Sequence, residues 1–437
     1  MPLEKELQFH FLGFLKKHKL MIPSDIIAKK RNGEELKSTD LSCFITKYLR
    51  GDISEAQMSA LLMAIYFNGM TEKELLILID VMIHSGHAIK FEKSDFFIAD
   101  KHSTGGIGDK TSIILAPVMA AAGVRIPMIA GRRLEYTGGT IDKLESIPGI
   151  NVTPSLNKFK SWVENIGCAI ISQSKEICPA DYKIYALRNQ TATVPSIPII
   201  CSSIMSKKIA EGIMGLVMDI KVGNGAFMKT KNDAFKLSHL IKKVAISYGL
   251  EIDIIYSDMN KPLGRYAGMG CEIKEAIDCL KGNGSQDLMD NTFELCSCLF
   301  IQAGKAKDKH ESKEIFDKII KTGKAFEFFQ KMIFNQNGCL KQFEKNIIPK
   351  FEKIIRSNKD GTIIFMDTEK IGWSLIELGC GNKKKLDKLD NTAGIEFFVK
   401  PGDIIKKGNP IYRVFNTNSK KLDSTSELLL NTIRVNK

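Results

Sequence analysis

The sequence has no apolar run long enough to cross a membrane, no internal repeat and no low-complexity tail. Its first residues, Met1 to Leu20, mix acidic with basic side chains, so we expect no signal peptide. The ten cysteines are scattered along the chain, and we expect reduced thiols and no metal site among them. These absences exclude a membrane protein and a disulfide scaffold, and we expect a cytoplasmic protein.

The balance of charge is positive, with a net charge of +13 over 437 residues. Such an excess is typical of a nucleic-acid binder or of a protein with anionic small substrates. The basic residues are spread along the chain, and aromatic residues are not interleaved among them. We therefore favour compositional bias together with a site for anions, and expect no nucleic-acid partner. The apolar content of 44% fits two or three globular domains.

The chain divides into segments with different patterns. Residues 1–90 are expected to form a helical domain, with helices throughout 22–90, and a helical stretch over 180–212 could return to this unit. Residues 91–179 and 213–355 alternate short strands and helices, which predicts a mostly parallel sheet with helices on both faces. Residues 356–437 are strand-like and predict a compact C-terminal α+β module. The fold class expected is therefore α/β: a small all-helical domain, a larger mixed α/β domain and the module.

Particular elements follow from the same patterns. Thr71 and Glu74 have the spacing of a capping box at the start of a helix. The expected strands of the α/β segment are 96–99, 125–130, 169–172, 216–222 and 253–257, with helices over 112–122, 157–166 and 232–248. Further along, residues 313–334 are expected to be helical, and strands are expected at 362–366, 394–399 and 410–415.

A glycine-rich stretch over residues 100–112, DKHSTGGIGDKTS, lies between an expected strand and an expected helix. This arrangement directs backbone N–H groups and the positive end of a helix at an anion. Gly105, Gly106 and Gly108 leave room for the ligand, since they carry no Cβ. The stretch lacks the Gly-Lys-Ser/Thr ending of a P-loop and the glycine spacing of a dinucleotide fold. It predicts a phosphate site of another type.

Polar side chains in this stretch suit an anion. Lys101, Ser103 and Ser112 offer a charge and two hydroxyls. His102 lies between them; a lone histidine is more often structural, but within an anion loop an imidazole can donate to the substrate. A second strand-to-glycine-turn-to-helix junction, over 131–145, places Thr140 where a hydroxyl could meet the same phosphate.

Helical positions supply a third group of polar residues. Tyr185 and Arg188 are three apart, and Ser203 and Lys207 are four apart on one helical side. They could serve a substrate that also contacts the phosphate loop. The alternative for Arg188 and Lys207 is a solvated helix face.

Taken together, these motifs closely resemble the pyrimidine-nucleoside and thymidine phosphorylases. The resemblance covers the chain from about Asp25 onward and is most specific between Asp100 and Gly264. The motifs that carry it are DKHSTGG (100–106), TGGTIDKLESIPG (137–149), PAD (179–181), YALR (185–188), SIMSKK (203–208), VGNGAFM (222–228) and DMNKPLG (258–264). The first 20 or so residues look like an extension.

The resemblance implies a homodimer that splits uridine, thymidine or deoxyuridine with inorganic phosphate, giving free base and (deoxy)ribose 1-phosphate. It implies that phosphate is held by Lys101, His102, Ser103, Ser112 and Thr140. It also implies that the base is held by Arg188, Ser203 and Lys207 in a pocket walled by Tyr185, Leu134 and Phe227. Catalysis would then rest on Arg188, Lys207 and a protonated or donating His102, which stabilise the departing pyrimidine anion.

The sequence departs from the pattern of these phosphorylases in the second turn. Ala130 lacks a hydroxyl that the family places near phosphate, and Arg133, Glu135 and Tyr136 replace two glycines and a histidine. These changes affect the expected substrate rather than the reaction type. Arg133 is expected either to compensate for Ala130 or to form a surface salt bridge.

A monovalent cation is a second point of departure. Related phosphorylases hold potassium through positions that correspond to the backbone at Gly108, Leu263 and Tyr266, a hydroxyl at position 110 and the carboxylate of Glu275. Position 110 is lysine here, whose ammonium cannot ligate a cation. We expect Lys110 to replace the ion and pair with Glu275, so no cofactor is required; the alternative is that Lys110 faces solvent and the ion binds.

Three other functions stay open. Anthranilate-type phosphoribosyltransferases share the expected fold, but would need a diphosphate substrate and Mg²⁺, and the residues around Arg188 and 203–207 argue against them. A phosphorylase for a modified nucleoside is also possible. A nucleic-acid-binding protein would show salt-dependent affinity for DNA or RNA without phosphorolysis.

Overall fold

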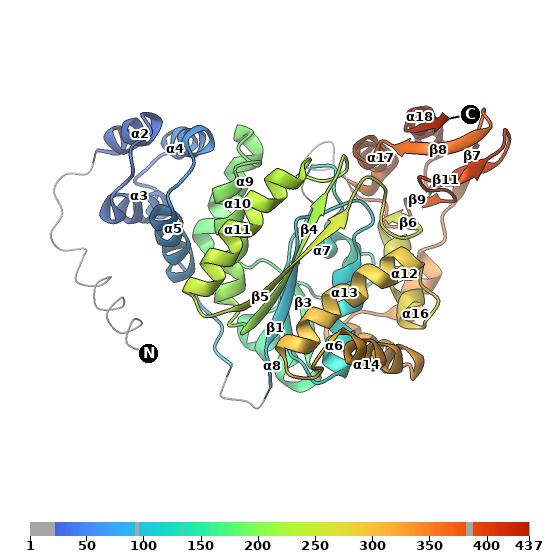
Figure 1. The fold of residues 1–437 in the computed structure, drawn as a ribbon, viewed down its shortest axis with the longest axis horizontal. Helices are drawn as coiled ribbons and strands as arrows, with labels where there is room; N and C mark the ends of the chain where they lie inside the picture. Colours follow the sequence, from blue (N-terminus) through green and yellow to red (C-terminus); the bar gives the residue numbers. More distant parts are fainter. Residues whose placement is uncertain (1–21, 92–95, 134, 382–387, 437) are drawn as a thin grey trace. The chain divides into compact units, whose positions relative to one another are not determined.

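The computed structural model describes residues 22–91, 96–133, 135–381 and 388–436, and so excludes the N-terminal extension. The chain forms two compact units (Figure 1). The first combines the described residues up to Gly86 with Cys178–Ser203, and the second contains His87–Ile177 and Ile204–Lys437. No described helix is long and apolar enough to cross a membrane.

The first unit is entirely helical in its described part. Its helices are α2 (Pro23–Arg31), α3 (Ser38–Arg50), α4 (Glu55–Asn68), α5 (Glu72–His84), α9 (Pro179–Thr191) and the first half of α10 (Ile197–Ala210). Leu41, Phe44 and Tyr48 of α3 are fully buried in its core. The capping box predicted for Thr71 and Glu74 is confirmed at the start of α5.

Glu74 also forms a buried ion pair in this unit. Its carboxylate accepts two hydrogen bonds from Lys30 Nζ, at 2.8 and 2.9 Å, and others from the backbone N–H groups of Leu36 and Thr71. Because the side chains of Lys30 and Glu74 are almost completely inaccessible, removing either charge would leave the other buried and unpaired.

The second unit is built on a parallel sheet. Its strands are β1 (Ala99–Ser103), β2 (Ile126–Ala130), β3 (Cys168–Ser172), β4 (Gly215–Val222) and β5 (Glu251–Asp258). β1, β4 and β5 pair in that order, β2 pairs with β3, and a parallel bridge between Ile98 and Arg125 joins the two groups. The strand order is therefore β3-β2-β1-β4-β5.

Crossover helices cover this sheet on both faces. α6 (Thr111–Ala121) and α8 (Leu156–Ile166) connect β1 to β2 to β3, in one direction across the sheet. α11 (Lys231–Ser247) connects β4 to β5 in the other direction. Right-handed crossovers that run in opposite directions place their helices on opposite faces. The predicted α/β class with a mostly parallel sheet is confirmed.

The reversal of direction lies between β1 and β4. At such a switch point the loops that leave the carboxyl ends of neighbouring strands diverge, and ligands bind between them. The glycine-rich loop after β1 begins at this point, so the topology places it where an anion site is expected.

The predicted boundaries of the first strand were wrong. The first strand is Ala99–Ser103 rather than 96–99, because Asp100 to Ser103 pair with β4 although they are polar. The helical structure expected over 313–334 is confirmed and consists of α14 (Lys309–Lys321) and α15 (Lys324–Asn335), separated by Gly323 at a φ of 73°.

Sequence patterns missed β6 (Tyr266–Gly268) and β7 (Phe351–Arg356). They also missed β10 (Ile404–Ile405) and β12 (Ile433–Asn436). These strands are too short or too exposed to show a regular pattern of apolar residues.

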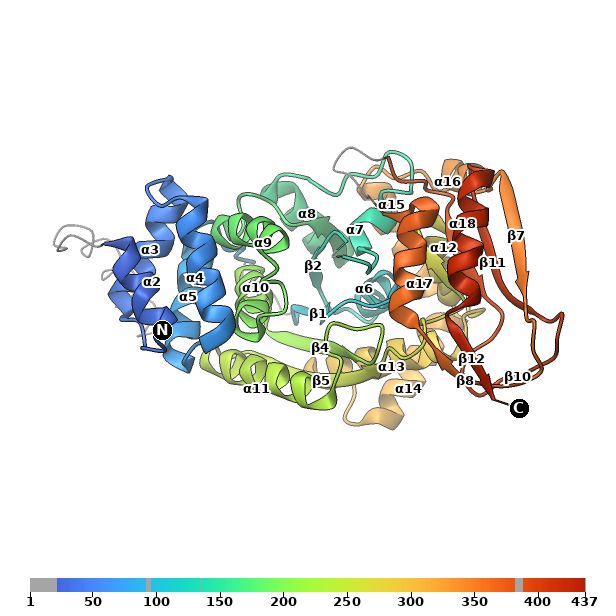
Figure 2. The same ribbon diagram turned by 90° about the horizontal axis from the view of Figure 1, so that it is seen from above.

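The C-terminal module contains two antiparallel sheets. One has the order β6-β9-β11-β7, with β9 at Gly394–Phe397 and β11 at Pro410–Asn416; the other has the order β10-β8-β12, with β8 at Gly361–Met366. Helices α17 (Thr368–Leu375) and α18 (Ser419–Leu430) lie beside them (Figure 2).

β6 precedes α12 (Gly270–Leu280) in the α/β segment, and α13 (Gln286–Gln302) follows. The pairing of β6 with β9 therefore joins the module to the α/β core.

Candidate active site

Lys101 lies at the centre of a buried polar cluster at the end of β1. Its Nζ donates to Thr111 Oγ1 at 2.7 Å and to Ser112 Oγ at 3.3 Å. The nearest carboxylate oxygens are farther away, at 3.7 Å in Asp109 and 3.9 Å in Asp219. Burial lowers the pKa of Lys101, and the charges of the two aspartates oppose this only in part. The structure thus brings Lys101 and Ser112 together, as the sequence predicted.

Ser103, at the last position of β1, contacts the loop rather than Lys101. Its hydroxyl donates to Asp109 Oδ2 at 2.6 Å and accepts from the N–H of Gly105 at 3.1 Å. The other oxygen of Asp109 accepts from Thr111 Oγ1 at 2.7 Å. Burial alone would raise the pKa of Asp109, but the charges of Lys101 and Lys221 and these hydroxyl groups hold it well below its usual range. Asp109 is therefore ionised.

The sequence analysis missed several members of this cluster, among them Lys221 and Asp219 on β4. Lys221 Nζ lies 2.6 Å from Asp219 Oδ2 and 4.0 Å from Asp109 Oδ2, and Lys221 and Asp219 are both fully buried. A signal was present, because the two charged residues are two apart in an otherwise apolar strand and must share one face.

His102 is partly exposed and lies within the field of several lysines. Burial and the positive charges of Lys208, Lys207 and Lys101 bring the pKa of His102 well below 6.5. Lys208 itself is held by Asp100, at 2.5 Å, and by Glu211. Of the two forms that the sequence analysis allowed, the neutral imidazole, which donates one N–H, is the form present near neutral pH.

The second turn runs from the end of β2 to α7 (Thr140–Leu144), so the predicted strand-to-helix junction is present. Thr140 is the first residue of α7. Gly105, with a φ of 86°, approaches this turn so closely that a Cβ there would lie 3.5 Å from Thr137 Oγ1. The two predicted phosphate segments are therefore neighbours.

Of the residues predicted to wall a base pocket, Leu134 lies outside the described residues. Phe227 stacks on Tyr136, with ring centroids 5.9 Å apart and planes 29° apart. Tyr136 is itself buried, and its ring also lies beside Trp373 of α17. Tyr136 thus supports the Phe227 ring.

In the first unit, α9 carries Tyr185 and Arg188. The guanidinium carbon of Arg188 lies 5.8 Å from the centroid of the Tyr185 ring, and Nη2 donates to the carbonyl of Val194 at 2.5 Å. Burial lowers the pKa of Arg188, although Asp181 opposes the shift.

α10 carries Ser203, the last residue of the first unit, and Lys207, which belongs to the second. Arg188 is only 2% exposed and Lys207 only 9%, so the solvated-face interpretation is wrong.

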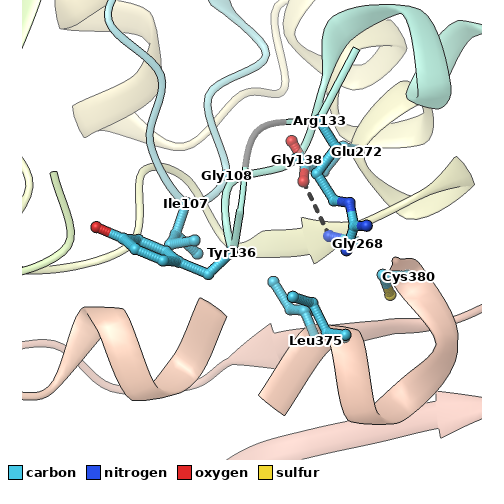
Figure 3. Close-up of a pocket in the computed structure, with 10 residues that line it drawn as sticks. Ile107, Gly108, Arg133, Tyr136, Gly138, Gly268, Glu272, Leu375 and Cys380 are labelled. Atoms are coloured by element: carbon cyan, nitrogen blue, oxygen red, sulfur yellow. Dashed lines mark hydrogen bonds between the residues drawn. The ribbon is translucent and has the colours of Figure 1, made fainter. Parts of the chain in front are cut away.

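The side chain of Arg133 extends toward a small pocket that Glu272, Gly268 and Cys380 also line (Figure 3). A Cβ at Gly381 would lie 2.0 Å from Arg133 Nη1, so this arginine packs against the C-terminal module. The neighbouring Arg132 pairs with Glu145 at 2.6 Å and with Asp142 at 3.1 Å.

Lys110 is fully buried beside α12. Its Nζ lies 2.5 Å from Glu275 Oε2 and donates to the carbonyl oxygens of Tyr266, at 2.7 Å, and Leu263, at 3.3 Å. Burial alone would lower the pKa of Lys110, but the charges of Glu275 and Glu272 outweigh it and raise the pKa. The alternative in which Lys110 faces solvent is wrong.

We predict that His102 stays neutral across the range in which most histidines titrate. Its imidazole NMR signals, assigned with His102→Asn, should not titrate between about pH 6 and 8. Lys207→Gln removes a positive charge and should raise the midpoint, whereas Lys236→Gln, on an exposed face of α11, should not. A wild-type midpoint near 6.5 would contradict the prediction.

Comparison with known proteins agrees with this architecture. The family model described as "Glycosyl transferase family, a/b domain" matches residues 96–326, and its "helical bundle domain" counterpart matches residues 24–86. A third model, "Pyrimidine nucleoside phosphorylase C-terminal domain", matches residues 362–436. Among solved structures, anthranilate phosphoribosyltransferase from Thermus thermophilus has a TM-score of 0.58 at 16% identity, covering 71% of this chain and 99% of its own. That likeness shows the fold alone.

Curated relatives are closer in sequence. The chain is 41% identical to the pyrimidine-nucleoside phosphorylase of Staphylococcus epidermidis, over 94% of this chain and 95% of the relative. It is 39% identical to that of Geobacillus stearothermophilus and 38% identical to that of Bacillus subtilis, with the same coverage. With all three family models matching in order along the chain, the protein belongs to the pyrimidine-nucleoside phosphorylase family.

Proposed function

We propose that the protein cleaves pyrimidine nucleosides with inorganic phosphate, giving the free base and a pentose 1-phosphate. The observation that carries the proposal is the weak pairing of the buried Lys101 ammonium with carboxylates. Lys110, Lys143 and Lys221 each lie within 2.5 to 2.6 Å of a carboxylate, whereas the carboxylates nearest Lys101 are at 3.7 and 3.9 Å. Lys101 is therefore the most weakly paired of these four buried ammonium groups, and an anion at the loop would complete its coordination.

The chemistry follows from the charges. Cleavage of an N-glycosidic bond leaves positive charge on the sugar and negative charge on the departing pyrimidine. Phosphate bound by Lys101, Ser103, Ser112 and Thr140 attacks the sugar carbon, while Arg188 and Lys207 stabilise the anionic base. Neutral His102 donates its N–H to a base oxygen or to phosphate, and Ser203 and Tyr185 orient the ring. No step requires a protonated imidazole.

The pocket around the base includes Phe227, whose position depends on Tyr136. Tyr136 stacks on Phe227, and its hydroxyl donates to the carbonyl of Ala226 at 3.3 Å, so Tyr136 packs against this wall. Uridine, thymidine and deoxyuridine are the substrates we propose to compare first, and a modified nucleoside is the next class to test.

We also propose a cytoplasmic homodimer. α4 presents a stripe of exposed apolar side chains at helical spacing, Ala56, Ala60, Met63 and Phe67, and Phe67 is 76% exposed. A second copy would remove this surface from water. Sedimentation equilibrium that finds a monomer at micromolar concentration would contradict this assembly.

The reaction itself can be tested directly. Purified protein incubated with each nucleoside should release uracil or thymine only when phosphate is present, and should form one pentose 1-phosphate for each base. Base release at the same rate without phosphate would identify a hydrolase and refute the proposal.

The proposed base-binding charges should act mainly on turnover. Arg188→Ala or Lys207→Ala removes a charge that is best matched to the leaving anion, so kcat should fall about a hundredfold, or roughly 3 kcal/mol. Circular dichroism would control for folding. Near-normal kcat in both variants would place the base elsewhere.

We propose that the Lys110 ammonium takes the place of a monovalent cation. Activity in potassium-free and sodium-free buffer should then be unchanged when potassium is added. Lys110→Thr leaves Glu275 and two carbonyl groups around a hydroxyl, and should make activity depend on potassium. Strong potassium activation of the wild-type protein would overturn this proposal.

A further inference from the structure

Lys143 is a fully buried lysine in the second turn. Its Nζ donates to the backbone carbonyl of Asp109 at 2.8 Å and lies 2.6 Å from Glu272 Oε2. The other oxygen of Glu272 accepts from the N–H of Gly268 at 2.8 Å, the bond drawn in Figure 3. Lys143 thus connects three segments: α7, the loop after β1, and α12.

Gly138 leaves room for the Lys143 side chain. A Cβ at Gly138 would lie 3.1 Å from Lys143 Cε, so any larger residue there would press on the lysine. Transferring a lysine and a glutamate from water into such an interior is unfavourable unless they are paired and hydrogen-bonded. The Lys143–Glu272 pair therefore contributes a fixed geometry of the three connected segments rather than stability of the fold.

Glu272 has a counterpart one turn along α12. Glu275 is three residues later on the same side of the helix, and it holds Lys110. Asp109 is consequently fixed twice, through its own carbonyl by Lys143 and through the next residue by Lys110. The loop is tight as well, because a Cβ at Gly108 would lie 2.3 Å from the carbonyl of Leu263.

The side chain of Asp109 connects the fixed backbone of the loop to the proposed phosphate ligands through hydrogen bonds. Its carboxylate accepts from the hydroxyls of Ser103 and Thr111, and the Thr111 oxygen accepts from Lys101. Moving the Asp109 backbone would therefore turn the Ser103 hydroxyl and shift the Lys101 ammonium.

Lys143 also bears on the second phosphate segment. It lies three residues after Thr140 in the five-residue helix α7. A bond from this helix to Asp109 fixes the separation between Thr140 and the loop that follows Ser103. Both segments must contact one small anion, so this separation matters to within a fraction of an ångström.

We propose that Lys143 and Glu272 are a positioning pair, which sets the distance between the two phosphate-binding segments without touching phosphate. The inference rests on the proposed function for its kinetic consequence. Its binding consequence can be measured without any turnover.

The test compares two buried lysines, each paired with a buried glutamate, of which only Lys143 lies beside the proposed phosphate segments. Lys143→Met and Lys30→Met each remove a buried ammonium from a glutamate and keep a side chain of similar length. We expect both to lower the melting temperature. Lys143→Met alone should raise the KM for phosphate, about tenfold, while the KM for nucleoside at saturating phosphate changes less than about twofold.

Phosphate binding gives a second readout. Inorganic phosphate should raise the melting temperature of the wild type and of Lys30→Met, because a ligand of the folded state stabilises it, and should raise that of Lys143→Met much less. If Lys143→Met does not fold, Glu272→Gln, which keeps an oxygen for Gly268, should show the same selective effect more weakly.

The outcomes separate the two proposals. If phosphate stabilises the wild type but no phosphorolysis occurs, the proposed function is refuted. The positioning pair is then still tested by the phosphate-induced change in melting temperature. Equal changes in the two KM values, or an unchanged KM for phosphate and an unchanged phosphate-induced stabilisation in folded Lys143→Met, would refute the positioning pair. A phosphate effect lost equally in Lys30→Met would also refute it, since general destabilisation would then be the cause.

Discussion

Burial of charge around the loop after β1 is the constraint on which this structure depends. Lys101, Lys110, Lys143 and Lys221 are all buried there, together with Asp109, Asp219, Glu272 and Glu275. A buried charge without a partner costs several kcal/mol, so each lysine requires a carboxylate nearby. Three of the pairs are close, and the fourth, around Lys101, is loose. The three closely paired ammonium groups therefore shape the loop, whereas the loosely paired Lys101 ammonium is the one available to a substrate anion.

The same concentration of positive charge decides the state of His102. Its pKa lies well below 6.5 because burial and three lysines disfavour a further proton. A phosphate dianion in the loop would act in the opposite direction and raise the pKa. Phosphate binding and the pKa of His102 would therefore be coupled through electrostatics, while the N–H that His102 donates is already present in the neutral imidazole.

The C-terminal module reaches this loop through the backbone. Tyr266 of β6 pairs with Glu396 of β9, and its carbonyl accepts from Lys110. Gly372 of α17 lies so close to the loop that a Cβ there would be 2.8 Å from Ile107 and from Tyr136. These contacts make the predicted C-terminal α+β module one wall of the region that holds the loop.

Much of this protein could be predicted from its sequence. Alternating short strands and helices predicted the parallel sheet, the capping box at Thr71 predicted the start of α5, and a glycine-rich stretch predicted the loop between a strand and a helix. Such features depend on local backbone geometry and on the periodicity of apolar residues, and both can be read from the local sequence. The motifs from Asp100 to Gly264 also resembled one family strongly enough to suggest the reaction.

Tertiary structure decided what the order of residues left open. Nothing local shows that the polar run from Asp100 to Ser103 is a strand, since only pairing with β4 makes it one. The partner of Lys143 lies 129 positions away, at Glu272, on a helix whose sequence pattern does not indicate it. The pairing of Lys110 with Glu275, 165 positions away, was predicted only through the resemblance to related phosphorylases. Whether a lysine meets solvent, a substrate or a carboxylate depends on which distant segment packs against it, and that is settled only when the chain is folded.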